Sequence, residues 1–142
     1  MSAGRHFLQI PGPTNTPDRV LRAMAAPVMD HRGPAFAALA LGLLADLKTV
    51  FKTQQGQVVL YPGSGTGAWE AALVNTLSPG DRVLTFETGH FAMLWAEMAR
   101  AYGLEVETVP LEWGRGVPAP VVHETLAADA RHAYRAVLVV HN

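Results

Sequence analysis

The spacing of apolar residues predicts two helices in the first third of the chain, then alternating strands and helices. Thr16-Pro17 is a typical helix start, and it begins a short predicted helix that Pro27 ends. A longer helix is predicted over 35–52, where one face is apolar: Leu39, Leu43, Leu47, Val50 and Phe51. From residue 57 onward, the predicted strands cover 57–61, 82–86, 104–109 and 135–140, and the predicted helices cover 68–77, 91–102 and 120–130.

Strands that alternate with helices in this way are typical of an α/β fold with a parallel sheet and crossover helices. Ligands of such sheets bind outside the carboxyl ends of the strands. The strand ends that offer polar or flexible residues are 61–67, 87–91 and 141–142. We therefore expect a functional site to draw on these segments.

Length and composition are those of one ordinary folded domain. The chain has 142 residues, 49% of them hydrophobic and 16% charged, which is enough apolar material for a core. Its 11 basic residues face 12 acidic ones and form no basic stripe, which argues against a nucleic-acid partner. The lack of Cys excludes a thiolate zinc site, and the 6 His residues have no metal-ligand spacing, so we predict no metal.

The ends of the chain carry two further expectations. The first ten residues do not have the pattern of a secretory signal, and the apolar stretch 35–45 is shorter than the roughly 20 residues that span a bilayer. We therefore expect a cytoplasmic protein with no membrane partner. The β-branched run 136–140 is typical of a buried strand, yet the sequence stops two residues later. A domain rarely ends on a central strand, so we expect a truncated chain.

The most informative segment is the glycine-rich turn Pro62-Gly63-Ser64-Gly65-Thr66-Gly67, which joins a predicted strand to a predicted helix. Glycines let the backbone approach a ligand closely, and the free N–H groups and dipole at a helix start favour an anion. Ser64 and Thr66 add hydroxyl donors. The turn therefore predicts a phosphate site, with a ligand-free turn as the alternative.

Three classes of cofactor use turns of this kind. A dinucleotide fold needs Gly-x-Gly-x-x-Gly, but the third glycine comes one residue early here and Ala68 takes its place. S-adenosylmethionine methyltransferases use Gly-x-Gly-x-Gly, usually with an acid just before it, where this chain has Tyr61-Pro62. Pyridoxal phosphate is the third class. Spacing alone leaves the last two open.

The segment after the second predicted strand bears on the same choice. In a methyltransferase, Glu87 would bind ribose hydroxyls. In a pyridoxal enzyme, an aromatic residue would stack on the pyridine ring, and His90 and Phe91 are both candidates. The ordinary alternatives are a helix cap for His90 and a core position for Phe91. Trp69 and Trp95 are predicted to be packing residues of their helices.

These segments together resemble the N-terminal part of the class V aminotransferases of fold type I, most of all serine–glyoxylate and alanine–glyoxylate aminotransferases. The resemblance covers nearly the whole chain, and its stretches occur in the order found in that family. The stretches are Ile10-Pro11-Gly12-Pro13-Thr14-Asn15, Asp30-His31-Arg32-Gly33-Pro34, the glycine-rich turn with Trp69-Glu70-Ala71-Ala72-Leu73-Val74-Asn75, and Ser78-Pro79-Gly80-Asp81 leading to Glu87-Thr88-Gly89-His90-Phe91.

The resemblance implies an N-terminal arm and dimer-contact segment over 1–34 and an incomplete large domain over 35–142. It implies pyridoxal 5'-phosphate as cofactor, a small amino acid such as serine or alanine and glyoxylate or a similar 2-oxo acid as substrates, and a homodimeric parent. Ser64, Gly65 and Thr66 match the family's phosphate-binding turn, and Phe91 matches the aromatic residue that stacks on the cofactor ring. The arm at 11–15 would cross the mouth of the active site.

The resemblance also implies roles that this chain fills in part or not at all. His31-Arg32 resembles a pair that binds substrate anions, although Ala35 stands where the family commonly has an acid. Neither Lys48 nor Lys52 matches the Schiff-base lysine, so no catalytic residue is assigned and the chain alone is predicted to be inactive. The alternatives are an S-adenosylmethionine methyltransferase and a non-catalytic dimerisation remnant.

Overall fold

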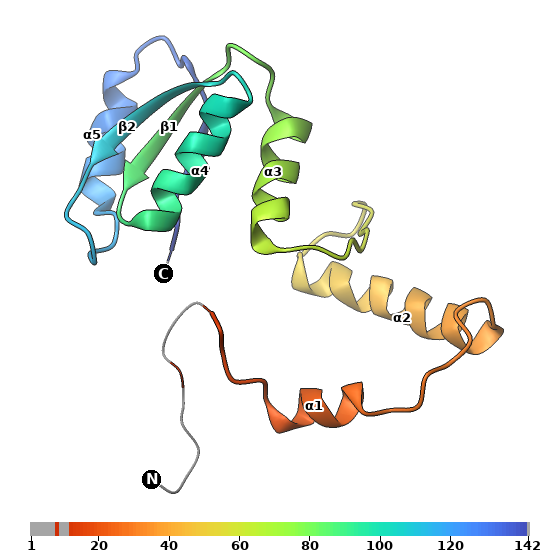
Figure 1. The fold of residues 1–142 in the computed structure, drawn as a ribbon. Coiled ribbons are helices and arrows are strands. Elements are labelled where there is room, and N and C mark those ends of the chain that lie inside the picture. The colour runs from red at the N-terminus through yellow and green to blue at the C-terminus, as the bar shows by residue number, and fades with distance from the viewer. Residues whose placement is uncertain (1–7, 9–11, 142) are drawn as a thin grey trace, which may run out of the picture. The chain divides into compact units, whose positions relative to one another are not determined.

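In the computed structural model, residues 8 and 12–141 are described, and they form two compact units, Met1–Tyr61 and Pro62–Asn142. The first unit contains α1 (Asp18–Met24) and α2 (Pro34–Val50). The second contains α3 (Gly65–Thr76), β1 (Arg82–Glu87), α4 (His90–Ala101), β2 (Glu105–Pro110), α5 (Ala119–Ala128) and β3 (Tyr134–Leu138) (Figure 1).

Both predicted helices of the first unit are present, but neither buries a residue. Pro34 opens α2 at a position where its missing N–H leaves no hydrogen bond unmade. The predicted apolar face of α2 is not covered, and the large side chains on its sides are solvent-exposed, among them Phe36, Leu39, Leu41, Leu43 and Val50. A helix that is apolar around much of its surface is suited to burial against other protein.

The strand predicted at 57–61 is wrong for this structure. These residues adopt no regular structure, and the side chains of Val59, Leu60 and Tyr61 are 63%, 61% and 86% exposed. A β-strand is stable when its N–H and C=O groups pair with a neighbouring strand. In the described part of the chain, no segment pairs with 57–61, so its apolar composition alone does not make it a strand.

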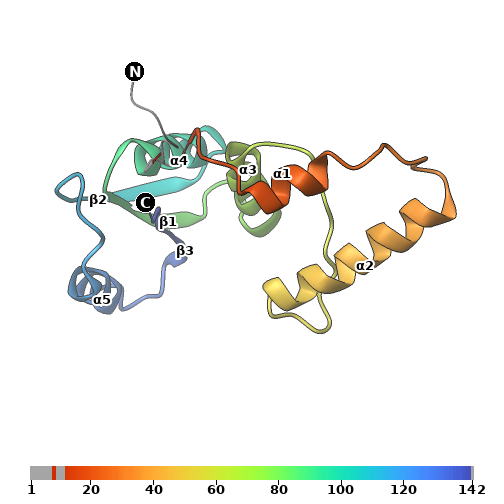
Figure 2. The ribbon, with the colours of Figure 1, turned by 90° about the horizontal axis from the view of Figure 1, so that it is seen from below.

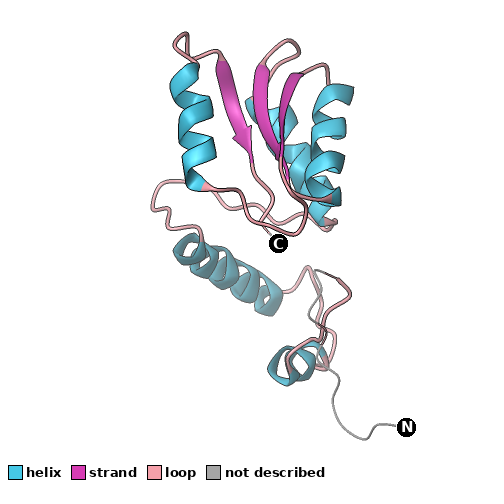
Figure 3. Cartoon of the chain, turned by 90° about the vertical axis from the view of Figure 1, so that its left-hand side faces the viewer, coloured by secondary structure: helices cyan, strands magenta, loops and turns pink. Residues whose placement is uncertain are grey.

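The second unit is built on a three-stranded parallel sheet in the order β2-β1-β3. Val83 of the central strand lies opposite Val106 on one side and Ala136 on the other. Two views show α4 and α5 on opposite faces of the sheet (Figures 2 and 3). The predicted parallel α/β arrangement is therefore confirmed for three of the four predicted strands.

The core of this unit lies between the sheet and the α4 side. Val83, Leu84 and Phe86 of β1 are fully buried, as expected for a central strand of a parallel sheet, and Thr85 between them is buried as well. Small residues of α4 face the sheet and let the helix approach it closely: Ala92, Ala96 and Ala99. The apolar cluster is completed by residues from α3, the start of β2 and the end of β3: Leu73, Leu104 and Leu138.

A tight turn before β1 is hydrogen-bonded to the segment that precedes β2. Gly80 has a φ of 90° and donates its N–H to the carbonyl of Gly103, the predicted end of α4, which has a φ of 78°. An added side-chain carbon at Gly103 would lie 3.3 Å from Pro79, so both backbone conformation and space favour glycine there. Among the described residues, no helix has both the length and the apolarity needed to cross a membrane.

Candidate functional site

The glycine-rich turn forms the first turn of α3. Ser64 is the N-cap residue, and its Oγ accepts a hydrogen bond from the N–H of Gly67 at 3.3 Å. The helix therefore begins at Gly65, three residues before the predicted start, because the cap of Ser64 satisfies one of the free N–H groups at the helix end. Since Ser64 Oγ acts as acceptor, its own proton is free to be donated to a ligand.

The donors at this helix end suit an anion. The N–H groups of Gly65 and Thr66 have no hydrogen-bond partner among the described residues, as expected for the first residues of an α-helix. Ser64, Gly65 and Thr66 are all solvent-exposed. The positive end of the helix dipole adds to this arrangement, so the 64–67 turn offers both donors and a favourable potential to a phosphate or carboxylate.

Gly63, Gly65 and Gly67 are not required by the packing of this structure. A side-chain carbon added to any of the three would have no atom within 4 Å, and none of the three has a left-handed φ. The cost of glycine in a helix, about 1 kcal/mol relative to alanine, is therefore not offset by local packing or a special backbone conformation. The open space at the three glycines lets a ligand approach the backbone closely, and the residues present therefore fit a bound phosphate group.

Phe91 is the second residue of α4, and its side chain is 44% exposed. The alternative of a core position is therefore not what the structure shows. The ring lies 6.1 Å from that of Trp69 on α3, at an interplanar angle of 70°, and 5.9 Å from that of His90. Trp69 thus connects the helix that carries the 64–67 turn with the helix that carries Phe91. An exposed, braced ring is suited to stacking on a flat ligand.

The carboxyl end of β1 is closed by the loop after β2. Trp113 donates its Nε1–H to Glu87 at 3.2 Å, and the N–H of Leu111 donates to the Glu87 carbonyl. One carboxylate oxygen of Glu87, the residue that a methyltransferase would use for ribose, is thus already hydrogen-bonded within the protein. Next to it, the hydroxyl of Thr88 is buried with no partner in the described part of the chain. Thr88 lies in the predicted strand end 87–91 but has no predicted role of its own, and nothing in the sequence pattern indicates Trp113.

His31 and Arg32 lie in the other unit, between α1 and α2, and both are exposed. The N–H of Arg32 donates to Asp30 Oδ1 at 2.9 Å, so the loop is fixed by a local turn. Of the arm predicted at 11–15, Pro11 lies outside the described residues, and Asn15 Oδ1 accepts a hydrogen bond from the N–H of Leu8. The anion-binding role of His31-Arg32 stays a prediction.

The amino ends of the strands carry a charged network that has a structural role. Arg82 pairs with Glu107 at 2.5 Å and lies 4.8 Å from the ring centre of Tyr134. Hydrogen bonds with Tyr134 and Arg82 lower the pKa of Glu107. The N–H groups of Ala133 and Tyr134 donate to Asp129 at 3.0 Å each and lower the pKa of that carboxyl group. These contacts join the starts of β1 and β3 to the middle of β2, and Arg82 lies at the opposite end of β1 from Glu87.

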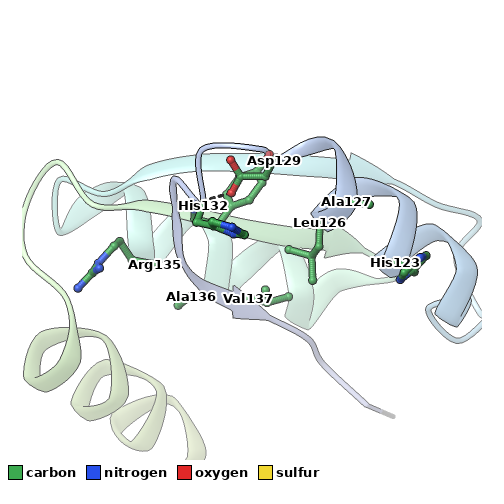
Figure 4. Close-up of a pocket in the computed structure, with 9 residues that line it drawn as sticks. His123, Leu126, Ala127, Asp129, His132, Arg135, Ala136 and Val137 are labelled. Carbon is green, nitrogen blue, oxygen red and sulfur yellow. Dashed lines mark hydrogen bonds between the residues drawn. The ribbon is translucent and has the colours of Figure 1, made fainter.

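A wide hollow of about 590 Å³ lies between α5 and β3 (Figure 4). Its lining is mainly apolar, with Leu126, Ala136 and Val137 beside His123 and His132. It borders the start of β3, whose Tyr134 pairs with Arg82 at the beginning of β1, and so lies away from the ligand-binding edge of a parallel sheet. In the described residues no group of three or more His, Asp or Glu side chains is arranged to hold a metal ion.

Comparison with known proteins identifies the class to which this fold and turn correspond. No protein-family model matches the chain. The chain is 45% identical over 98% of its length to a serine–glyoxylate aminotransferase of Arabidopsis thaliana, and 47% identical over 94% to an L-aspartate–glyoxylate aminotransferase of Paracoccus denitrificans. Among solved structures, an aspartate aminotransferase of Thermus thermophilus superposes with a TM-score of 0.72 at 33% identity, covering 89% of this chain.

The resemblance seen in the sequence is thus confirmed: over nearly its whole length the chain is homologous to class V aminotransferases, and the Arabidopsis and Paracoccus relatives are glyoxylate aminotransferases. Its helices and parallel sheet match the N-terminal part of fold type I. The chain spans about a third of the length of the relatives it matches, 35% of the Arabidopsis protein and 34% of the Thermus chain.

Proposed function

We propose that this chain supplies the phosphate-binding turn and the ring-stacking residue of a pyridoxal 5'-phosphate-dependent aminotransferase. The observation that carries the proposal is the 64–67 turn: free N–H donors at a helix start, beside glycines that the packing of the protein does not require. The glyoxylate aminotransferases to which the chain is similar support the same assignment.

Each proposed site residue has a distinct task. The N–H groups of Gly65 and Thr66 and the hydroxyls of Ser64 and Thr66 donate to the phosphate, and such charge-assisted bonds are stronger than neutral ones. Phe91 covers one face of the cofactor ring and fixes its plane. When bound, the cofactor supplies an electron sink for carbanions next to the amino group.

The proposed substrates are a small amino acid and glyoxylate or a similar 2-oxo acid. The relatives at 45% and 47% identity are named for serine and for L-aspartate, so this third of the sequence is similar among enzymes with different donors. We therefore propose that the residues that select the amino donor lie outside these 142 residues. In this proposal, His31 and Arg32 contribute positive charge for a substrate carboxylate.

The proposed activity is that of a longer enzyme, and the chain alone is proposed to be inactive. The reaction needs a lysine that binds the cofactor and moves a proton. Lys48 lies near the end of α2 and Lys52 follows that helix, in the unit that does not carry the 64–67 turn. Neither matches the lysine of the family.

The exposed apolar side chains of α2 favour a second role, that of an association segment. We propose a second copy of the chain or of its longer parent as the partner, as the family resemblance implies. Sedimentation of the chain at several concentrations tests this role. A monomer at every concentration would contradict it.

The test of the cofactor assignment is a titration of the purified chain with pyridoxal 5'-phosphate and, separately, with S-adenosylmethionine. We expect saturable binding of pyridoxal 5'-phosphate. We expect no stoichiometric lysine Schiff base that borohydride can reduce, and no serine–glyoxylate transamination. Binding of S-adenosylmethionine instead would overturn the proposal in favour of a methyltransferase. Measurable transamination would overturn the proposed inactivity of the chain alone.

A further inference from the structure

The aromatic residues between α3 and α4 form a connected set centred on Trp69. Its ring stacks on that of Trp95, with centroids 5.4 Å apart and an interplanar angle of 17°. It also meets Phe91 edge-on, at 6.1 Å and 70°. Both arrangements are ones that aromatic pairs prefer. Trp69 therefore contacts two residues one helical turn apart on α4, and its orientation is fixed from both.

The position of Trp69 on α3 links this set to the phosphate-binding turn. Trp69 follows Gly65 by four residues, so helical periodicity places the two on the same face, one turn apart. The residue whose ring contacts Phe91 thus belongs to the helix that begins with the free N–H groups, one turn after Gly65. Trp69 is half-buried, and Phe91 keeps 44% of its surface exposed.

We propose that Trp69 is a positioning residue that holds the Phe91 ring in a fixed orientation relative to the 64–67 turn. This inference rests on the proposed function, because it assigns a purpose to the orientation of Phe91. Edge contact by Trp69 restrains the Phe91 ring while leaving one face of it for the ligand. The distance between the phosphate donors and the stacking face is then set by one rigid indole. Rigid placement of this kind improves affinity because less freedom is lost on binding.

A residue that merely filled space would leave a different signature. If Trp69 only filled space, an aliphatic side chain could replace it. The ratio of the affinities for ligands with and without an aromatic ring would then stay the same. A positioning role predicts that ring-dependent binding is lost and phosphate-dependent binding is kept. The two roles are therefore separated by comparing pyridoxal 5'-phosphate with glycerol 3-phosphate, a phosphate monoester that has no ring.

The test uses the 142-residue chain with Trp69→Leu, the conservative Trp69→Phe, and Phe51→Leu as a matched control on an exposed aromatic residue outside the set. We expect Trp69→Leu to weaken pyridoxal 5'-phosphate binding about five- to tenfold and glycerol 3-phosphate binding less than twofold. The visible circular dichroism of the bound pyridoxal compound, which reports ring orientation, should fall in Trp69→Leu and recover in Trp69→Phe. Phe51→Leu should change neither quantity.

Unchanged pyridoxal 5'-phosphate affinity in Trp69→Leu, or equal weakening of both ligands, would overturn the positioning role and leave the proposed function standing. No binding of either ligand by the unsubstituted chain would overturn both. If Trp69→Leu does not fold, Trp69→Phe is used in its place. We expect this variant to bind pyridoxal 5'-phosphate about twofold more weakly and glycerol 3-phosphate with unchanged affinity. Equal weakening of both ligands by Trp69→Phe would again overturn the positioning role.

Discussion

The hydroxyl of Tyr102, at the end of α4, donates to Glu70 of α3 with 2.5 Å between the two oxygens. Glu70 is the neighbour of Trp69, which contacts Phe91 and Trp95 in the first half of the same helix. Two consecutive residues of α3 thus contact distant parts of α4. The helix that begins with the 64–67 turn is held against the helix that carries Phe91 at both points.

The bond to Glu70 raises the pKa of Tyr102, and burial of the phenol adds to the effect. A raised pKa in the folded chain means that the stabilisation is complete below the unfolded value of about 10 and is lost as the pH rises through the folded value. We expect the phenolate absorbance of Tyr102 to appear at higher pH than that of an unperturbed tyrosine. The Tyr102→Phe difference spectrum isolates this titration from the other tyrosines.

A matched variant tests whether the charged acceptor raises the pKa of Tyr102. Glu70→Gln keeps the size of the acceptor but removes its charge, so the Tyr102 titration should move back toward its usual range. Glu97→Gln, on the exposed side of α4, should leave it in place. A Tyr102 titration that is the same in all three chains would contradict the role given to this contact.

Asp129 should control part of the acid sensitivity of the fold. Its pKa is lowered by the N–H groups of Ala133 and Tyr134, so the stabilisation is present above the unfolded value of about 3.9 and is lost as the pH falls through the lower folded value. In Asp129→Asn, thermal unfolding should depend less on pH in this acid range, with a lower midpoint near pH 7. Asp129→Ala should lower it further.

The control for Asp129 is the exposed pair of Glu112 and Arg115, whose carboxylate and guanidinium groups lie 2.7 Å apart. Exposed pairs contribute little to stability, so Glu112→Gln should leave both the midpoint and its acid dependence nearly unchanged. An equal loss of acid dependence in the two variants would contradict the assignment to Asp129.

Leu73 should be one of the residues on which the second unit depends most. It is 2% exposed and packs from α3 into the cluster with Val83 and Leu138. We expect Leu73→Ala to lower the free energy of unfolding by about 2–4 kcal/mol, measured by urea denaturation. Leu94→Ala, at a position 38% exposed on α4, should cost less than about 1 kcal/mol. A similar loss of unfolding free energy in both variants would contradict the core position assigned to Leu73.

The sequence predicts the second unit better than the first, for a physical reason. The runs that became β1, β2 and β3 pair with one another in one sheet, and β1 is buried between the other two, so their apolar pattern and their structure agree. The run 57–61 is as apolar, but it has no pairing strand among the described residues. Composition shows that a segment is suited to burial, whereas a strand also needs a partner for its backbone.

Only one part of the candidate site, the 64–67 turn, could be predicted from the sequence. The turn at 64–67 could be found because glycine, serine and threonine at a helix start have local consequences. The helix begins three residues earlier than predicted because the Ser64 side chain accepts a hydrogen bond from the N–H of Gly67. The contacts of Trp69 with Phe91 and of Glu70 with Tyr102 join residues more than twenty positions apart, and no periodicity encodes them.

The glycines of the turn allow the most direct test of the account. Gly65→Ala adds a side-chain carbon where the protein has open space, so the thermal midpoint should stay the same or rise slightly. Gly103→Ala is the opposite control, because its left-handed φ and the nearby Pro79 should make it destabilising. The thermal midpoint and the affinity for the phosphate group are then both measured for Gly65→Ala and for Gly103→Ala.

The deciding measurement is the ratio of the dissociation constants for pyridoxal and pyridoxal 5'-phosphate, in the unsubstituted chain and in Gly65→Ala. We predict that the unsubstituted chain binds the phosphorylated compound at least about tenfold more tightly, because the free N–H and hydroxyl groups of the 64–67 turn bind the phosphate. Gly65→Ala should bring the ratio close to one while its thermal midpoint is maintained. Equal affinities in the unsubstituted chain, or an unchanged ratio in Gly65→Ala, would contradict the assignment of the phosphate site.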